Sequence, residues 1–290
     1  MATTSVSPDR AAAMRKRARG RYFKTRLALA IVITLIMFFP LYWMIVTALS
    51  PQEDLYSSGL HLWPRHFTLT HFSDPINTFP VWRWFRNSIV ISLGVTFITV
   101  VCNLLAGFAF AKLAFRGRSA LFFLLLSTMM IPVQAIMVSQ FRLSIHLGLF
   151  GSIWSVILPE SATVFGVFLA RQFFIAIPDE LLEAARCDGA GHLKTFIRIV
   201  LPLCKPLIAV LTLLTLSSEW NSFAWPLVAL FGNEQLFTLP IGMVTDLQSQ
   251  YTSDYGAIMA MSLLMIAPMV VLFVAFQRYF IQGLARSGIK

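Results

Sequence analysis

Side chains of both charges gather in one segment of the chain, DELLEAARCDGAGHLKTFIRIVLPLCKP, which runs from residue 179 to residue 206. This segment lies between two long apolar runs and is punctuated by glycine. Carboxylate and guanidinium groups beside small residues on a short helix can form charge-assisted hydrogen bonds with another protein surface. The chemistry that the segment offers is therefore docking. A merely solvated loop, or a helix lying on lipid headgroups, is the alternative.

Two further carboxyl groups, those of Glu160 and Glu219, lie within long apolar runs. A charge at membrane depth is costly, so each group should face the protein interior or water. Neither stands near a histidine cluster or a serine with a partner base, and the sequence therefore does not predict an enzyme. Both acids are candidates for a substrate pathway, and a position near the end of a helix is an equal alternative for Glu160.

Uncharged polar and aromatic residues in the apolar runs are the remaining candidates for contacts with a solute. Amide and carboxyl groups can hydrogen-bond to sugar hydroxyls, and an indole can stack on a sugar ring. The same residues can bond between helices or anchor a helix at the membrane interface, which is the stronger interpretation for Trp225. The candidate pathway residues are Asn103, Gln134, Gln140, Glu160, Glu219, Trp220 and Asn221.

Long apolar runs must position all of these residues. With 57% hydrophobic and 12% charged residues and a mean hydropathy of +0.74, the chain is predicted to be an integral membrane protein. Unbroken runs of this kind cannot alternate between two faces as barrel strands do, so the predicted fold class is an all-α polytopic membrane protein. Six runs reach the roughly 20 residues that a transmembrane helix needs: about 27–49, 87–111, 120–141, 152–174, 200–220 and 257–280.

Lysine and arginine are distributed unevenly between the two sides of these six spans. Alternate connections and both termini hold 18 of them, whereas the connections on the other side hold 4. Because basic residues are retained in the cytoplasm, both termini are predicted to be cytoplasmic. The expected organisation is a basic tail at 1–26, a transmembrane domain at 27–284 and a short tail at 285–290. The tail indicates topology and attraction to anionic lipid, and no nucleic-acid partner is expected.

Two short helices are predicted in the charged segment. Pro178 suits a first helical turn, and the acidic Asp179 and Glu180 favour the positive end of a helix dipole. Gly189 and Gly191 should end this helix, after which HLKTFIRIV forms a second helix that leads into the fifth span. The acidic start argues against a helix on lipid headgroups, which would carry lysine and arginine there.

A family resemblance rests on this segment and its surroundings. Glu183-Ala184-Ala185, then Gly189 after three residues, Ile199 after nine, and Leu201-Pro202 after one more match the EAA signature of ATP-binding-cassette (ABC) importer permeases. RNSIVIS, LAGFAFAKLAFRGRS, MMIPVQAIMVSQF, FLARQFFIAIPDELLEAARCDGAG, LPLCKPLIAV and EWNSFAWPL also resemble the carbohydrate-uptake, maltose permease MalG-like branch. The likeness covers about residues 27–290 and leaves the first 26 outside.

The resemblance implies a MetI-like permease core in a bacterial inner membrane, with a cytoplasmic two-helix EAA coupling loop at 178–202. It implies three partners: a second homologous permease in a heterodimer, a cytoplasmic ABC ATPase dimer, and an extracytoplasmic solute-binding protein that delivers a carbohydrate. The chain has no G-x-x-x-x-G-K-[ST] loop, so ATP and Mg²⁺ would be used by the partner ATPase and no cofactor by this chain. The implied coupling residues are Glu183, Ala184, Ala185, Arg186, Asp188, Gly189, Ile199, Leu201 and Pro202.

Some alternatives stay open at this point. An ATPase-independent secondary transporter or channel is the other function, although no internal repeat of the kind such transporters show is found. Glycerol-3-phosphate or a polyol is the other substrate. His61, His66 and His71 recur every five residues, a poor spacing for convergent ligands, so no metal site is expected. Three cysteines without ligand spacing predict no disulfide framework.

Overall fold

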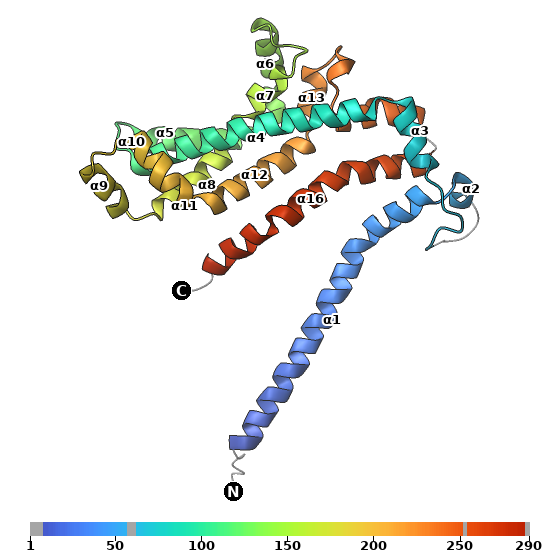
Figure 1. The fold of residues 1–290 in the computed structure, drawn as a ribbon, viewed down its shortest axis with the longest axis horizontal. Coiled ribbons are helices and arrows are strands. Elements are labelled where there is room, and N and C mark those ends of the chain that lie inside the picture. Colours follow the sequence, from blue (N-terminus) through green and yellow to red (C-terminus); the bar gives the residue numbers. More distant parts are fainter. Residues whose placement is uncertain (1–7, 57–61, 252–253, 288–290) are drawn as a thin grey trace. The chain divides into compact units, whose positions relative to one another are not determined.

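The computed structural model describes residues 8–56, 62–251 and 254–287, and within these ranges all regular structure is helical (Figure 1). The chain divides into two compact units. Unit 1 comprises Met1–Phe72 with Asp254–Leu263, and unit 2 comprises Ser73–Ser253 with Leu264–Lys290. The candidate coupling segment and all of the candidate pathway residues belong to unit 2.

Unit 1 is dominated by helix α1 (Pro8–Leu49), which is followed by the short α2 (Gln52–Leu55) and the start of α3 (Thr70–Thr78). Residues 8–26 of the predicted basic tail form one helix with the first apolar span, because their alanines and arginines are good helix formers and Pro8 suits a first turn. Pro40 lies inside α1 without ending it. The first span is thus the apolar part of a longer helix.

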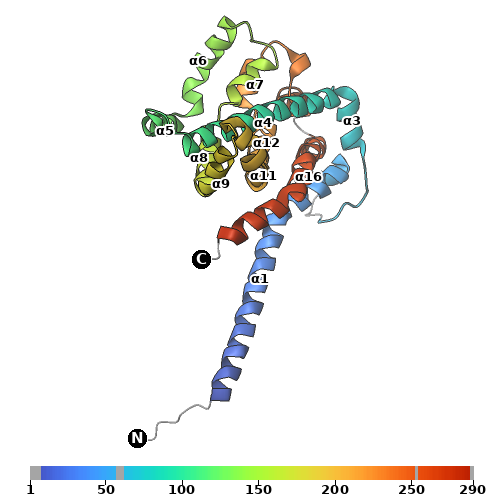
Figure 2. The same ribbon diagram turned by 60° about the vertical axis from the view of Figure 1, so that its left-hand side comes forward.

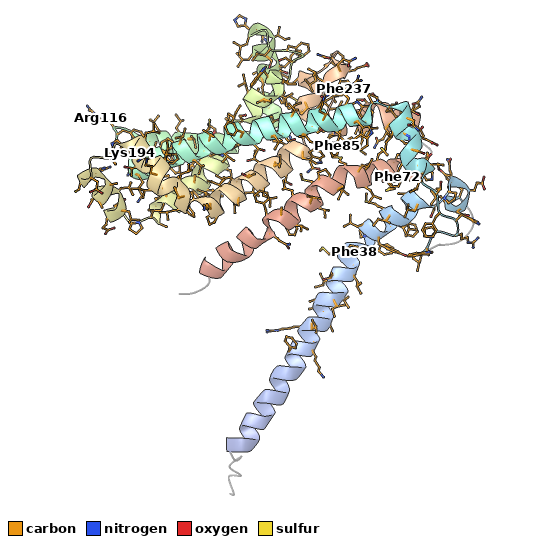
Figure 3. All side chains as sticks on the ribbon, in the orientation of Figure 1. Phe38, Phe72, Phe85, Arg116, Lys194 and Phe237 are labelled. Carbon is orange, nitrogen blue, oxygen red and sulfur yellow. The ribbon has the colours of Figure 1, made fainter. Side chains whose placement is uncertain are left out.

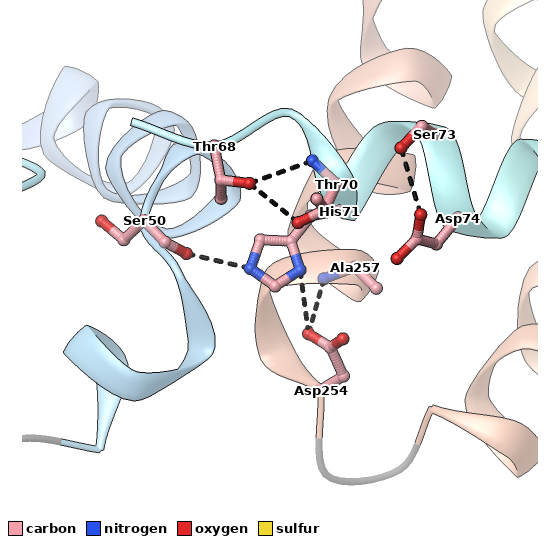
Figure 4. A network of polar contacts seen from close by, with 8 residues as sticks. All are labelled: Ser50, Thr68, Thr70, His71, Ser73, Asp74, Asp254 and Ala257. Carbon is pink, nitrogen blue, oxygen red and sulfur yellow. Dashed lines mark hydrogen bonds and ion pairs between the residues drawn. The ribbon is translucent and has the colours of Figure 1, made fainter. Parts of the chain in front are cut away.

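A buried histidine joins three segments of unit 1, as Figure 4 shows. Nε2 of His71 lies 2.9 Å from the carbonyl oxygen of Ser50, just after α1, and Nδ1 lies 3.3 Å from a carboxyl oxygen of Asp254. The same carboxyl oxygen accepts the backbone N–H of Ala257 in the first turn of α16 (Tyr255–Ser287). The imidazole therefore ties the end of α1 to the beginning of α16.

Of the other two histidines in the five-residue series, only His66 is described, and it pairs with a different residue. His66 Nδ1 faces Asp54 at 3.2 Å, and His61 lies outside the described residues. In the part of the chain that the structure describes, no group of three or more His, Cys, Asp or Glu side chains is arranged to hold a metal ion. The three cysteines are free thiols.

Unit 2 is built on helix α4 (Val81–Lys112), which lies alongside α8 (Val164–Ile175) and α12 (Lys205–Trp220) in both views (Figures 1 and 2). Gly166 allows α8 to approach closely, because a Cβ there would collide with the side-chain amide of Asn103 on α4. At the other end of α4, Asn87 Nδ2 donates to the carbonyl oxygens of Gln235 and Phe237, at 2.9 and 3.0 Å. The segment before α16 is thereby fixed to α4.

Three of the six predicted spans are bent. Prolines within the apolar runs invite kinks, but the sequence does not indicate which spans bend or by how much. The bends lie between Arg118–Met130 and Val133–His146 (102°), between Trp154–Glu160 and Val164–Ile175 (43°), and between His192–Leu203 and Lys205–Trp220 (80°). Proline accounts for two of these bends. Pro132 lies directly before the helix Val133–His146, and Pro206 lies in the first turn of the helix Lys205–Trp220. The straight part of the predicted fifth span therefore starts at Lys205, not at Val200.

Among the residues that the structure describes, three single helical segments are long and apolar enough to cross a membrane, and up to six crossings result if each bent pair counts as one. The single segments are Phe23–Leu49, Val81–Lys112 and Tyr255–Gln277. The remaining helices are α5 (Arg118–Ser127), η1 (Thr128–Met130), α6 (Val133–His146), α7 (Trp154–Glu160), α9 (Glu180–Cys187), α10 (His192–Thr195), η2 (Phe196–Val200), α11 (Leu201–Leu203), α13 (Ala224–Ala229), η3 (Glu234–Leu236), α14 (Leu239–Gly242), η4 (Met243–Leu247) and α15 (Gln248–Gln250).

Candidate functional site

The candidate coupling segment, residues 178–202, contains two helical stretches joined by a tight turn. The first is α9, for which Asp179 is the N-cap residue, so Pro178 lies just before the helix and not in its first turn. Gly189 has φ +76°, its N–H donates to the carbonyl of Arg186, and the N–H of Ala190 donates to that of Ala185. This is a Schellman ending, in which glycine accepts the left-handed conformation without a Cβ clash.

The second stretch starts at Gly191, which the sequence prediction placed at the end of the first. Gly191 has an extended conformation and is the N-cap residue of α10. From there α10, the π-helical η2 and α11 continue to Leu203, with a break at Cys204 before α12. The coupling segment therefore passes directly into the helix that carries Glu219.

One face of the segment packs into the core of unit 2. Leu182 and Ala185 on α9 and Phe196 on η2 are buried. The Phe196 ring lies 5.0 Å from Phe108 on α4 and 6.4 Å from Phe174 on α8, centroid to centroid. Phe108 and Phe174 are themselves in edge contact at 5.8 Å. Three aromatic rings thus connect the segment to the two helices that pack most closely in unit 2.

The opposite face of the segment is exposed and mixes acidic, small and apolar side chains. Glu183 makes no side-chain hydrogen bond or ion pair within the described residues. Leu193 and Ile197 are 65% and 50% exposed, although both are large and apolar. Of the other predicted coupling residues, Ala184, Arg186, Asp188, Gly189 and Pro202 are exposed, Ala185 is buried, and Ile199 and Leu201 are half-buried.

An ion pair fixes the start of the segment to α4. Lys112, in the last turn of α4, donates from Nζ to Asp179 Oδ1 and to the carbonyl oxygen of Ile177, both at 2.6 Å. The Lys112 side chain is only 5% exposed, whereas that of Asp179 is 75% exposed. The hydrogen bond from Lys112 and its positive charge lower the pKa of Asp179 below its usual range.

Asp179→Asn should weaken this attachment in a pH-dependent way. Because the pKa of Asp179 is lowered in the folded state, the pair stabilises the protein above the unfolded-state pKa of about 3.9, and this contribution is lost as pH falls through the lower folded-state value. We expect Asp179→Asn to unfold at a slightly lower temperature than wild type at pH 7, and the difference to shrink below about pH 4 and to vanish below the lowered folded-state pKa of Asp179. Thermal unfolding in detergent measures it.

The control is Lys112→Met, which removes the other partner of the ion pair. In a Lys112→Met background the substitution Asp179→Asn removes no ion pair, so it should leave the unfolding temperature unchanged at pH 7. An Asp179→Asn effect of the same size in both backgrounds would show that the ion pair contributes nothing.

A hollow with mainly apolar walls and a few polar groups lies between α4, α8 and α12, away from the coupling segment. Its volume is about 230 Å³. Asn103 Nδ2 donates to Thr163 Oγ1 at 3.0 Å on one side of it, and Glu219 lies on the other. Two of the predicted pathway residues, Asn103 and Glu219, are therefore brought together. The lining consists of Asn103, Thr163, Phe165, Gly166, Leu211, Leu214, Thr215, Ser218 and Glu219.

Thr163, Thr215 and Ser218 line this hollow but were not among the predicted residues. Thr215, Ser218 and Glu219 recur at helical spacing on one face of α12, after Leu211. This spacing is a signal that could have identified them from the sequence. Thr163 lies in the break between α7 and α8, which hydropathy alone does not show.

The other predicted pathway residues lie elsewhere. Trp220 is buried against Phe85, with its Nε1–H donating to the carbonyl of Met265 at 2.9 Å. Asn221 is exposed and bonds to the Ser217 carbonyl. Gln134 is exposed on α6, where Gln140 is half-buried, and Glu160 is half-buried at the end of α7. Trp225, interpreted as an interface anchor, is instead buried and donates to the carbonyl of Ser155.

Residues 103–286 match the model of the binding-protein-dependent transport system inner membrane component family. The chain belongs to this family. The matched region of the permease includes the coupling segment, the hollow and the bend at Cys204.

Curated relatives cover nearly the full length of the permease. It is 38% identical over 261 residues to the arabinooligosaccharides transport system permease protein AraQ of Halalkalibacterium halodurans, which covers 89% of this chain and 93% of that protein. It is 32% identical over 270 residues to the sn-glycerol-3-phosphate transport system permease protein UgpE of Escherichia coli O1:K1, with 91% and 95% covered. Both relatives are permease proteins of transport systems.

The fold of the permease is also found in solved structures. A bacterial ABC transporter involved in the import of the acidic polysaccharide alginate aligns with a TM-score of 0.80 at 21% identity, covering 96% of this chain and all of that chain. A bacterial alginate ABC transporter in complex with its alginate pentasaccharide-bound periplasmic protein aligns with a TM-score of 0.64 at 16% identity, with 90% and 94% covered. At these identities the likeness concerns the fold.

Proposed function

We propose that the permease is one of two membrane subunits of an ATP-driven importer that carries a carbohydrate delivered by an extracytoplasmic binding protein. The observation that carries the proposal is the construction of the 178–202 segment. Its outer face offers an unpaired Glu183 beside exposed Ala184, and its inner face is packed through Phe196 onto α4 and α8. A surface built in this way can receive force from a partner and pass it to the membrane helices.

The proposed partner at this surface is a cytoplasmic ABC ATPase dimer, which binds and hydrolyses ATP with Mg²⁺. A positive group in its cleft would pair with Glu183, and the small Ala184 would allow close approach. The other proposed partners are a second homologous permease, which completes the pathway, and a solute-binding protein. The sugar and glycerol-3-phosphate systems of the relatives, and the periplasmic protein in the alginate complex, support this composition.

The proposed topology has six crossings in a MetI-like core, with each bent helix pair counted as one crossing and with the coupling segment and both termini in the cytoplasm. Figure 3 supports this orientation for unit 2, since Arg116 and Lys194 lie at the end that carries α9 and α10, whereas Phe85 and Phe237 lie toward the other. Basic residues retained on one side indicate the cytoplasm.

The proposed mechanism follows from the connections of the coupling segment. Closure of the ATPase dimer on ATP moves α9, whose position relative to α4 is held by the Lys112–Asp179 pair and by buried Leu182. The Schellman turn at Gly189 keeps the two helical stretches at a fixed angle, so the movement continues through Phe196 to α12. Since α12 also lines the hollow, ATP binding can change the access of solute to it.

Reconstitution tests this function. The permease, its co-encoded second permease, ATPase and binding protein should together transport solute into proteoliposomes only when ATP is supplied, and a thermal-shift screen of the binding protein against sugars, polyols and sugar phosphates identifies that solute. Transport by the permease alone, without ATPase, would instead establish a secondary transporter or channel.

A further inference from the structure

The hollow between α4, α8 and α12 contains an acidic group with an unpartnered oxygen atom. Glu219 is 9% exposed, and its Oε2 atom has no hydrogen-bond partner within the described residues. A buried carboxyl oxygen without a partner is costly, since it has lost its contacts with water and gained none from the protein. The side chain lines the hollow, so a molecule that enters there can supply the missing hydrogen bond.

The rest of the lining is suited to hydroxyl groups. Thr163, Thr215 and Ser218 contribute hydroxyls and Asn103 a carboxamide, and these groups can both donate and accept. Phe165 and Leu214 supply apolar surface against which the C–H face of a sugar ring can pack. Small-molecule sites combine apolar walls with a few polar groups in this manner.

The hollow offers no positive charge, since none of the described residues that line it is basic. The basic residues at the other ends of α4 and α8 are engaged elsewhere: Lys112 pairs with Asp179, and Arg171 lies 4.3 Å from the centre of the Phe122 ring. A phosphate or carboxylate in the hollow would therefore lose its hydration without gaining a cationic partner, which is costly.

We propose that this hollow is a binding subsite for an uncharged polyhydroxy solute, in which Glu219 hydrogen-bonds to a solute hydroxyl and the lack of a basic lining residue disfavours anionic solutes. The inference rests on the proposed function and narrows it, because the relatives include systems both for arabino-oligosaccharides and for sn-glycerol-3-phosphate. At about 230 Å³ the hollow is smaller than the roughly 300–1,000 Å³ typical of complete ligand sites, so it receives one part of an oligosaccharide.

The test uses the complete reconstituted importer and three versions of the permease: wild type, Glu219→Gln and Glu219→Leu. The probes are arabinotriose, sn-glycerol 3-phosphate and the solutes that shift the melting temperature of the binding protein. Each is measured for ATP-driven uptake and for stimulation of ATP hydrolysis. Recovery of the second permease and the ATPase with each variant is measured at the same time, and Glu53→Gln, at an exposed acid on α2, is the control.

Wild type is expected to transport uncharged solute and to leave sn-glycerol 3-phosphate outside. Glu219→Leu should lower uptake at least tenfold, mainly through a raised KM, with subunit recovery unchanged. Glu219→Gln retains an acceptor oxygen and should lose only about threefold. Glu53→Gln should behave as wild type.

Several results would overturn the inference. Transport of an anionic solute as the preferred cargo, or wild-type uptake by Glu219→Leu, would each do so. Loss of the second permease from the Glu219→Gln complex would show that Glu219 pairs with a partner chain and not with solute. Each of these results would leave the proposal of ATP-driven import intact. If wild type showed no ATP-driven uptake of any probe, the proposed function itself would be contradicted.

Discussion

The substitution Glu183→Lys is expected to abolish ATP-driven uptake while leaving the permease folded. Glu183 is exposed on α9 and makes no ion pair within the described residues, so its replacement removes no internal contact. Its position in the first turn of α9 accounts for no more than about 1 kcal/mol of interaction with the helix dipole. Truncating one partner of a desolvated charge pair across an interface costs about 2–5 kcal/mol, and charge reversal costs at least as much.

These magnitudes predict at least a 20-fold loss of ATPase binding, since each 1.4 kcal/mol is about a factor of ten. The measurement is recovery of the ATPase with the purified permease, together with uptake into proteoliposomes and the thermal midpoint of the permease alone. Glu53→Lys makes the same change at an exposed acid in the first turn of another short helix and should retain the ATPase. If Glu183→Lys retained both the ATPase and uptake, the outer face of α9 would not be the docking surface.

The helices of the coupling segment could be predicted from local sequence because their determinants are local. Acidic residues begin α9, and Gly189 ends it in the one conformation that strongly favours glycine. The prediction erred by two residues at Gly191, because glycine serves both as the end of one helix and as the N-cap of the next. What no local pattern contains is which face is buried, since this depends on Phe108 and Phe174 from distant helices.

The sequence also could not show which proline bends a span, because contacts with distant helices decide this too. Pro40 and Pro268 lie inside continuous helices, whereas Pro132 lies at a 102° break. Each proline removes one backbone hydrogen bond, but neighbouring helices decide whether the backbone compensates or turns. A hydropathy window averages over such a break and records one apolar run in both cases.

The surroundings of Trp220 and Trp225 could not be predicted from the sequence either. An indole has a large apolar body and one N–H donor, which suits a sugar, a membrane interface or a protein interior. The structure buries Trp220 and Trp225, and each N–H finds a backbone carbonyl in another helix, at Met265 and Ser155. Composition and spacing contain no information about these carbonyls.

Phe196→Ala should separate ATP hydrolysis from transport. Phe196 is 6% exposed and packs on Phe108 and Phe174, so its truncation leaves a cavity between η2, α4 and α8. Such substitutions cost about 3–5 kcal/mol in well-packed cores, which corresponds to a lower thermal midpoint by at least ~5 °C. The outer face of α9 is untouched, so the ATPase should still bind.

The informative quantity is the number of solute molecules transported per ATP hydrolysed, measured well below the lowered midpoint. We expect it to fall at least fivefold in Phe196→Ala, because movement of α9 is then absorbed by the cavity, and to recover largely in Phe196→Leu, which restores apolar volume. Leu193→Ala, at a 65% exposed site on α10, is the matched control for stability and should unfold as wild type does. An unchanged ratio in a destabilised Phe196→Ala would mean that the three aromatic rings hold the fold together but do not transmit the movement.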